Sequence, residues 1–340
     1  MKAWLKIMGV FVLLAASSLA DCARFTKPRQ TSSMEKCLAE FRAMPEVDGI
    51  LQSRAAAEQG REDAQPFSGM EIALTLNGAI RSTADPDADV DDLCYKQNNV
   101  ENLIKLIDTL KQNDMPPTVD FVSAKNLDPE MAELWLASGN LLGNLTYDNR
   151  RVIQVGAEDF VTDISAADEQ LAAIWRKHGQ AVKYFRYPAF KRAKDDSSRE
   201  TVERYLSKTG YVTVPCTIES MDDRFADIYC KALDEGDKSC ASLVKVNYYP
   251  VLMDTTLRAR AVARGLAGRE TSQILVLYLN QLTFDTLGQT LAWYRRLGAK
   301  FIGLDQALGD PFFKAAPGGG DPTGRTIVRA VRDEQMSLGK

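Results

Sequence analysis

Short apolar segments alternate with longer amphipathic segments over most of this chain, and this alternation restricts the fold more than any other feature. Segments typical of strands lie at 71–76, 118–122, 181–185, 211–218, 274–278 and 301–303. Segments with helical periodicity lie between and after them, at 100–110, 128–137, 158–176, 197–209, 222–235, 241–267 and 282–297. This order predicts parallel strands joined by crossover helices. At least six strands in about 240 residues fit a closed α/β barrel better than a divided sheet.

The flanking segments differ from this central part in composition. Four regions follow: a signal peptide at 1–20, an N-terminal helical extension at 21–69, the barrel at 70–313 and a flexible C-terminal tail at 314–340. Within the extension, residues 34–60 show helical periodicity. The tail begins with a run rich in Gly and Pro, which is typical of a flexible linker.

The first twenty residues have the pattern of a cleaved export signal. Lys2 and Lys6 precede an apolar core at 7–16 that is too short to span a bilayer, and Ser18-Leu19-Ala20 offers small side chains for cleavage. We therefore expect an exported protein, periplasmic or secreted, with no transmembrane segment. Cleavage removes two of 42 basic residues and none of 46 acidic residues, which leaves a net charge of −6. Such a charge argues against nucleic acid as a partner.

The cysteines permit disulfides, because an exported protein meets an oxidising environment. There are six, at positions 22, 37, 94, 216, 230 and 240. Cys22–Cys37 and Cys230–Cys240 would close short loops and are the first pairings expected. Cys216 lies in an apolar run and is expected to be a buried thiol. Cys22 also suggests a lipoprotein anchor, although the preceding Asp21 is too large and charged for the usual cleavage site.

Barrel enzymes place their chemistry at the carboxyl ends of the strands, so candidate site residues are expected directly after each predicted strand. Those segments are Thr75-Leu76-Asn77-Gly78, Gly143 to Asn149, Arg186-Tyr187-Pro188, Glu219 to Asp222, and Tyr278-Leu279-Asn280.

In order and spacing these segments resemble the five motifs of the polysaccharide deacetylases, carbohydrate esterase family 4. The family's T-F-D-D-G reads TLNGA at 75–79, and its H-T-x-x-H after Gly-Asn reads LTYDN at 145–149. Its R-x-P is intact at 186–188, its D-x-x-D-W aligns with 219–223, and its leucine-rich strand ends in Tyr278 instead of His. The likeness extends over residues 70–310 and implies a distorted (β/α)-barrel.

The resemblance assigns a role to each replaced position. Asn77 stands where the family has its general base, and Gly78 where it has the metal-binding carboxylate. Leu145 and Asn149 stand in place of the two metal-binding histidines, and Tyr278 in place of the general acid. Two supporting positions keep the residue types of the family. They are Arg186, which steadies the base, and Asp222, which tunes the acid.

The substituted side chains do not suit the family's chemistry. Asn77 has no titratable carboxylate, so it cannot accept a proton from water. Gly78 and Leu145 have no donor atom for a metal, and Asn149 offers only a neutral carbonyl oxygen. The single histidine of the chain, His178, lies in a helical segment and is expected to be solvated. We expect no catalytic residues, no bound metal and no cofactor. The acidic run at 85–92 lacks the Gly and Glu of a calcium loop, so we expect a solvated loop there.

Three functions remain open. The first is a catalytically inactive deacetylase-like protein that binds a polysaccharide or peptidoglycan, or acts as a scaffold. The second is a hydrolase with metal-free chemistry based on Tyr278, Asp222 and Arg186. The third is a protein-interaction module whose groove is closed by Leu145 and Leu76, with its working surface elsewhere, such as the 34–60 helix. For the first, the expected ligand-binding residues are Thr75, Asn77, Thr146, Tyr147, Arg186, Tyr187, Asp222 and Tyr278.

Overall fold

The computed structural model describes residues 33–44, 47–50, 65–78, 94 and 99–315. The predicted signal peptide, Cys22, the acidic run at 85–92 and nearly all of the predicted tail lie outside these residues. So does most of the predicted 34–60 helix, of which the structure describes helical segments at 33–42 and 47–50. Predictions about the remaining segments stay predictions.

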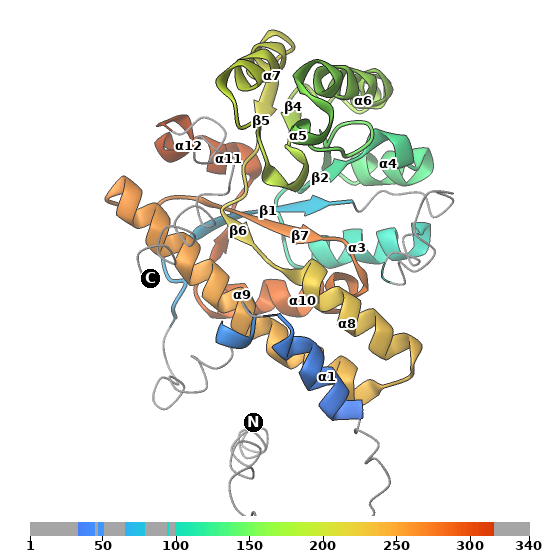
Figure 1. Cartoon of the computed structure of the whole chain (residues 1–340), viewed down its shortest axis with the longest axis vertical. Coiled ribbons are helices and arrows are strands. Elements are labelled where there is room, and N and C mark those ends of the chain that lie inside the picture. The colour runs from blue at the N-terminus through green and yellow to red at the C-terminus, as the bar shows by residue number, and fades with distance from the viewer. Residues whose placement is uncertain (1–32, 45–46, 51–64, 79–93, 95–98, 316–340) are drawn as a thin grey trace, which may run out of the picture.

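The strands that the structure describes form one parallel sheet, as the alternating pattern predicts. They are β1 Glu71–Asn77, β2 Val119–Val122, β3 Leu141–Asn144, β4 Lys183–Phe185, β5 Tyr211–Thr213, β6 Ile218–Glu219, β7 Gln273–Tyr278 and β8 Lys300–Phe301. Their order across the sheet is β5-β4-β3-β2-β1-β7-β6, and β8 pairs with the beginning of β1. The sheet curls into a half-barrel with helices around it, so the distorted barrel is confirmed (Figure 1).

The barrel is open rather than closed. β5 and β6 lie at opposite ends of the strand order, and the expected single strand at 211–218 is in fact these two short strands. The chain steps between them at 214–217. The Val214 N–H donates to the carbonyl of Phe185, and the Thr217 N–H donates to the carbonyl of Ile274. The seam therefore follows from Pro215, which has no N–H to continue a ladder.

Helices connect the strands and cover the outside of the sheet (Figure 1). The α-helices are α1 Ser33–Arg42, α3 Val100–Gln112, α4 Pro129–Ala137, α5 Val152–Val155, α6 Ala157–Lys177, α7 Asp196–Lys208, α8 Asp222–Asp234, α9 Lys238–Ala267, α10 Gln281–Arg296, α11 Leu304–Leu308 and α12 Pro311–Ala315. Two short 3₁₀ turns, η1 Ala124–Asn126 and η2 Pro188–Phe190, follow β2 and β4. Asn99, Asp128 and Asn280 cap α3, α4 and α10 by accepting backbone N–H groups.

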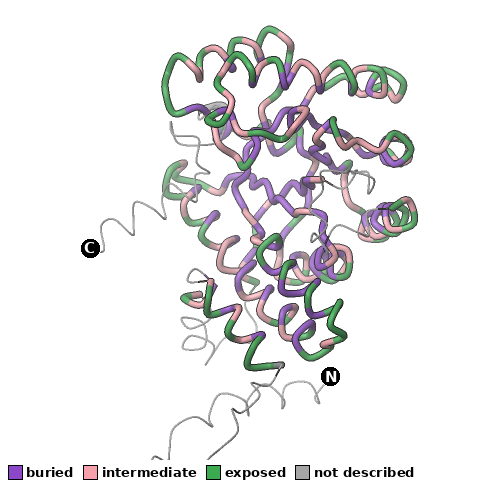
Figure 2. Tube along the Cα trace, turned by 45° about the vertical axis from the view of Figure 1, so that its right-hand side comes forward, coloured by how far each residue is buried: buried purple, intermediate pink, exposed green. Residues whose placement is uncertain are grey.

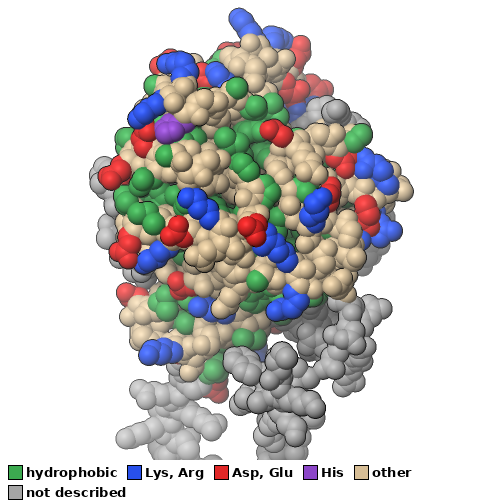
Figure 3. Space-filling model, turned by 180° about the vertical axis from the view of Figure 1, so that it is seen from behind, with side chains coloured by type: hydrophobic (Ala, Val, Ile, Leu, Met, Phe, Trp, Pro, Cys, Tyr) green, Lys and Arg blue, Asp and Glu red, His purple; other side chains and the backbone are tan. Residues whose placement is uncertain are grey.

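The core lies between the sheet and these helices. The central strands β1, β2 and β7 are buried along almost their whole length, and each helix buries one face against them (Figure 2). Strands buried on both sides explain why their sequences are apolar runs without alternation. On the opposite side from Figure 1, Lys, Arg, Asp and Glu side chains are interspersed, with no large patch of one sign (Figure 3). No helix in the described part of the chain has the length and apolar character needed to cross a membrane.

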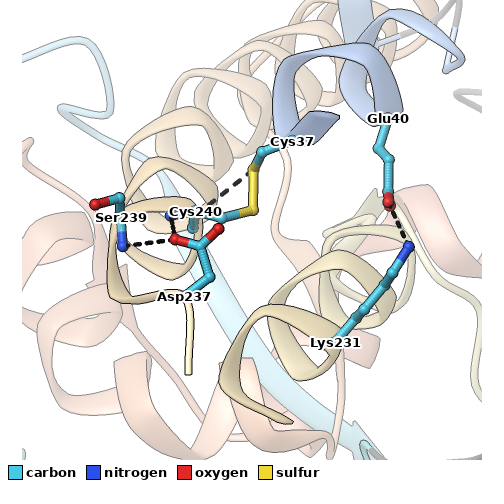
Figure 4. Close-up of a disulfide and its surroundings, with 6 residues drawn as sticks. All are labelled: Cys37, Glu40, Lys231, Asp237, Ser239 and Cys240. Carbon is cyan, nitrogen blue, oxygen red and sulfur yellow. Dashed lines mark hydrogen bonds and ion pairs between the residues drawn. A yellow bond between two sulfur atoms is a disulfide. The ribbon is translucent and has the colours of Figure 1, made fainter. Parts of the chain in front are cut away.

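Two disulfides join distant parts of the chain. Cys37 of α1 is bonded to Cys240 of α9, and Cys94 is bonded to Cys230 of α8 (Figure 4). Both expected local pairings are therefore wrong, because α1 packs on the α8–α9 hairpin and brings Cys37 to Cys240. An ion pair between Glu40 and Lys231 lies beside the first disulfide. Cys216 belongs to neither disulfide and is buried, as expected.

Candidate functional site

A cavity of about 440 Å³ opens at the carboxyl ends of five neighbouring strands. Segments that follow β1, β2, β3 and β4, together with the last residue of β7, form its wall. The lining residues are Asn77, Gly78, Ser123, Lys125, Asn126, Leu145, Asp148, Asn149, Ala189 and Tyr278. Three of the five segments that resemble deacetylase motifs contribute to this list, so the sheet gathers them at one place.

Behind the cavity, Arg186 connects β1 to the loop after β4. Its Nη1 donates to Asn77 Oδ1 at 2.8 Å, and its Nη2 donates to Thr75 Oγ1 at 2.8 Å. The guanidinium lies over the Phe121 ring, 3.8 Å from the ring centroid, which suits a cation on an aromatic face. Burial lowers the pKa of Arg186 to about 10, so the group keeps its charge at neutral pH.

Asp222 holds the wall on the β7 side. Its carboxylate accepts the backbone N–H of Tyr278 at 2.9 Å and the hydroxyls of Thr283 and Ser220 at 2.7 and 2.6 Å. Asp222 is fully buried, and this burial raises its pKa to about 7. Burial also raises the pKa of the Tyr278 phenol well above its usual range, so the phenol stays protonated at neutral pH. Tyr278 can therefore donate a hydrogen bond but cannot serve as a general base.

The loop after β3 keeps a defined frame although its metal-binding residue types are absent. Asn144 Oδ1 accepts the N–H of Thr146 at 2.7 Å, and Thr146 Oγ1 accepts the N–H of Asn149 at 3.0 Å. Thr146 and Asn149 both have left-handed backbone conformations, with φ of 68° and 56°. This turn brings both Leu145 and Asn149 to the cavity wall, the two positions that hold histidines in the family pattern.

The structure separates the predicted site residues into two groups. Asn77, Gly78, Leu145, Asn149 and Tyr278 line the cavity.

Thr75, Thr146, Arg186 and Asp222 are fully buried, so they support the wall rather than face it. The two remaining predicted contacts are also absent from the wall. Tyr187 is buried and stacks on Phe160, with ring centroids 6.0 Å apart, and Tyr147 is half-buried outside the lining. Tyr187 is therefore packed in the core, and its expected role as a sugar contact stays a prediction.

The sequence analysis missed five lining residues. They are Ser123, Lys125, Asn126, Asp148 and Ala189. The first three follow β2. This strand carries none of the family motifs, so the motif resemblance did not indicate the residues at its end. The rule that polar residues after a buried parallel strand face the site would have indicated them.

The residues present do not fit the metal that the family resemblance implies. Gly78 and Leu145 supply no donor atom, and Asn149 supplies at most a neutral amide oxygen. Within the described residues, no group of three or more His, Cys, Asp or Glu side chains is arranged to hold a metal ion. Asp148 is the acidic side chain in the lining, and it is engaged by Lys125 at 3.5 Å and Arg150 at 3.1 Å.

Comparisons with known proteins agree with the motif resemblance. Residues 89–214 match the family model described as polysaccharide deacetylase. The comparison with curated proteins found no match.

Solved structures similar to this chain include BA3943, a CE4 family pseudoenzyme from Bacillus anthracis. The two chains are 15% identical with a TM-score of 0.45, and the match covers 72% of this chain and 66% of BA3943. PdaA from Bacillus subtilis, a family 4 carbohydrate esterase, has 14% identity, a TM-score of 0.43 and coverage of 72% and 86%. A family 4 carbohydrate esterase from Streptomyces lividans has 15% identity, a TM-score of 0.44 and coverage of 72% and 97%.

The family-model match begins before α3 and ends at Val214, directly after β5. It contains the loop after β3 and Arg186, two of the segments on which the resemblance was based. The resemblance is therefore confirmed over residues 89–214, which match the polysaccharide deacetylase family model.

Proposed function

We propose that this protein is an exported, catalytically inactive member of the deacetylase type that binds a glycan in the cavity at the barrel mouth. One observation carries the proposal. The cavity persists at the strand ends, while the side chains at the five reaction positions provide neither a base nor a metal site nor a histidine acid. The site is thus shaped for a ligand and lacks the groups for the reaction.

The metal-free hydrolase receives little support from the same geometry. Tyr278 stays protonated, Asp222 and Arg186 are buried behind the wall, and Asn77 has no acid–base function. Asp148 faces the cavity but is held between two cations, Lys125 and Arg150. A general base must reach the water that it activates, and these side chains are poorly suited to that task.

A closed groove is also disfavoured. Leu76 is fully buried on β1 and does not reach the cavity, and Leu145 forms part of the wall without filling the space. The ring of Tyr278 and the side chain of Leu145 give apolar surface, and the amides of Asn77, Asn126 and Asn149 give hydrogen-bonding groups. This mixture suits sugar rings, which have apolar faces and polar edges. A shallow site of this kind should bind with a Kd of roughly 1 mM to 10 μM.

The test of binding is a titration of the mature protein with chito-oligosaccharides and peptidoglycan fragments. Tyr278→Ala should weaken binding at least several-fold because it removes the aromatic face. Tyr205→Ala, on the outer helix α7, is the matched control and should leave binding unchanged. Binding that both variants leave intact would move the working surface away from the barrel mouth, and binding to no glycan would favour a protein-interaction module.

The test of inactivity rebuilds the family pattern. The variant combines Asn77→Asp, Gly78→Asp, Leu145→His, Asn149→His and Tyr278→His. Gly78 and Asn149 have positive φ angles of 79° and 56°, and Asp and His tolerate this region better than most residues.

Metal analysis should find about one divalent ion per chain in the rebuilt variant and none held tightly by the natural protein, and only the rebuilt variant should deacetylate chito-oligosaccharides. Tight metal or deacetylation in the natural protein would overturn the proposal of inactivity. A folded variant that binds no metal would show that the assumed arrangement of the five positions is wrong.

A further inference from the structure

The charged groups at the cavity have both signs, so they give no basis for selecting a charged ligand. Lys125 and Asp148 are the two charged residues among the lining residues, and their Nζ and Oδ1 atoms lie 3.5 Å apart. Around the wall, positive and negative side chains are again mixed: Arg150 and Arg186, and Asp120, Asp163, Glu219, Asp222 and Asp223. Selectivity is therefore left to the neutral polar groups of the lining.

Two carboxamides of the lining, those of Asn126 and Asn149, are available to a ligand at both ends. Neither side chain forms a hydrogen bond with a described residue. Asn77 differs, because its Oδ1 accepts from Arg186 and only its NH₂ group is left for the cavity. Asn126 and Asn149 therefore each offer a carbonyl acceptor and an NH₂ donor side by side.

The two carboxamides stand on turns that are fixed to each other. The backbone N–H groups at 124–125 donate to the backbone carbonyls at 146–147, both at 3.1 Å. The ion pair between Lys125 and Asp148 joins the residues that directly precede Asn126 and Asn149. The backbone at both positions is therefore held in place, so that ligand binding costs mainly the freedom of the two side chains.

We propose that Asn126 and Asn149 form a carboxamide pair that recognises vicinal hydroxyl groups of a neutral glycan, while a sugar ring packs on Tyr278. This inference rests on the proposed function and adds the chemical class of the ligand. In a vicinal diol, one hydroxyl donates to the carboxamide oxygen while its neighbour accepts from the NH₂ group. A sugar that lacks one of the two hydroxyls leaves half of the carboxamide unpaired.

This chemistry separates glycans that have the same linkage. A β-1,4-linked glucose unit has free hydroxyls at C2 and C3, which form a vicinal diol. A β-1,4-linked N-acetylglucosamine unit has an acetamido group at C2, so its C3 hydroxyl has no hydroxyl neighbour. The carboxamide pair should therefore prefer the glucose chain to the N-acetylglucosamine chain.

The experiment titrates the mature protein with neutral probes. Cellotetraose is compared with chitotetraose, and methyl β-cellobioside with its 2,2′-dideoxy analogue, which loses the diols without gaining bulk. The natural protein should bind cellotetraose and methyl β-cellobioside about tenfold more tightly than their counterparts, because each counterpart leaves a donor or an acceptor unpaired. Both preferences should be insensitive to ionic strength, since no ligand charge takes part.

Three variants locate the preference. Asn126→Ala and Asn149→Gly each remove one carboxamide, and Gly tolerates the positive φ of 56° at position 149. Asn149→Asp keeps the size and the acceptor but removes the NH₂ donor. Each should reduce the preference for the diol several-fold. Gln289→Ala removes an exposed carboxamide on α10, outside the lining, and is the matched control that should change nothing. Circular dichroism and the unfolding midpoint establish that each variant is folded.

The outcomes separate this inference from the proposed function. Equal binding of methyl β-cellobioside and its dideoxy analogue, with both weakened by Tyr278→Ala, would overturn the diol and leave glycan binding in place. A preference that survives both Asn126→Ala and Asn149→Gly would also overturn it, as would tighter binding of chitotetraose than of cellotetraose. Failure of every sugar to bind would overturn both.

Discussion

The two halves of this barrel, on either side of the seam between β5 and β6, both contain buried hydrogen bonds but differ in their disulfides. In the β2–β5 half, buried and half-buried side chains hold the strands through hydrogen bonds. Asn144 Nδ2 donates to the Tyr211 hydroxyl at 2.8 Å, that hydroxyl donates to Asp168 at 2.7 Å, and Lys183 donates to the same carboxylate at 2.8 Å. In the other half, both disulfides end on the α8–α9 hairpin, at Cys230 and Cys240.

This difference matches the distribution of the family likeness. The family model covers the hydrogen-bonded half and ends at the seam, and that half supplies Arg186 and the loop after β3. The covalently linked half supplies Tyr278 and Asp222, and it also anchors α1 and Cys94.

Removing the Cys94–Cys230 disulfide should have the largest effect on stability. The double variant Cys94→Ala, Cys230→Ala should lose about 2–4 kcal/mol of unfolding free energy, because the link constrains a long loop in the unfolded chain. The backbone carbonyl of Cys94 also accepts the N–H of Gln281, next to the turn that follows Tyr278. Glycan affinity should therefore fall together with stability. Denaturant unfolding and the sugar titration measure the two effects.

The Cys37–Cys240 disulfide tests whether the link to the cavity is specific to Cys94. Cys37→Ala, Cys240→Ala should cost a similar free energy but leave the cavity intact, because α1 packs on α9 away from the strand ends (Figure 1). Equal loss of glycan affinity in both double variants would contradict the view that only Cys94 supports the β7 wall.

In the hydrogen-bonded half, Gly143→Ala should give the next largest effect. A Cβ at Gly143 would lie 2.5 Å from two ring carbons of Phe121, and this ring packs beneath Arg186. Overpacking of this kind costs about 1–3 kcal/mol, and the displaced ring would disturb the hydrogen bond from Arg186 to Asn77. Unfolding measurements should show the loss, and glycan affinity should fall. Gly303→Ala is the control, because nothing lies within 4 Å of a Cβ at that position.

The fold was largely predictable because buried parallel strands and amphipathic crossover helices leave strong periodic signals. The seam was missed because residues 211–218 form one apolar run, in which Pro215 was the only sign of a break. The disulfides were missed for a different reason. Spacing along the chain favours local pairs, whereas the packing of α1 on α9 brings Cys37 to Cys240 across 203 residues.

The position of the site was predictable from the sequence, but only some of its lining residues were. Strand ends and motif spacing located five lining residues, including Asn77 and Tyr278. Spacing cannot say which way a side chain turns, so Tyr187 was expected at the cavity although it lies in the core beside Phe160.

The smallest expected effect concerns Asp222 and pH. Its pKa is raised to about 7 in the folded protein, whereas an Asp in an unfolded chain has a pKa of about 4. Between these values the folded state holds a proton that the unfolded state releases, so this group's contribution to stability falls as the pH rises through 7. From pH 6 to pH 8 the fall should be about 1 kcal/mol. Asp222→Asn cannot titrate, so the difference in unfolding free energy between natural protein and variant should shift by this amount in favour of the variant. A difference that stays constant over this range would show that the hydrogen bonds from Ser220, Thr283 and Tyr278 keep Asp222 ionised in the folded state.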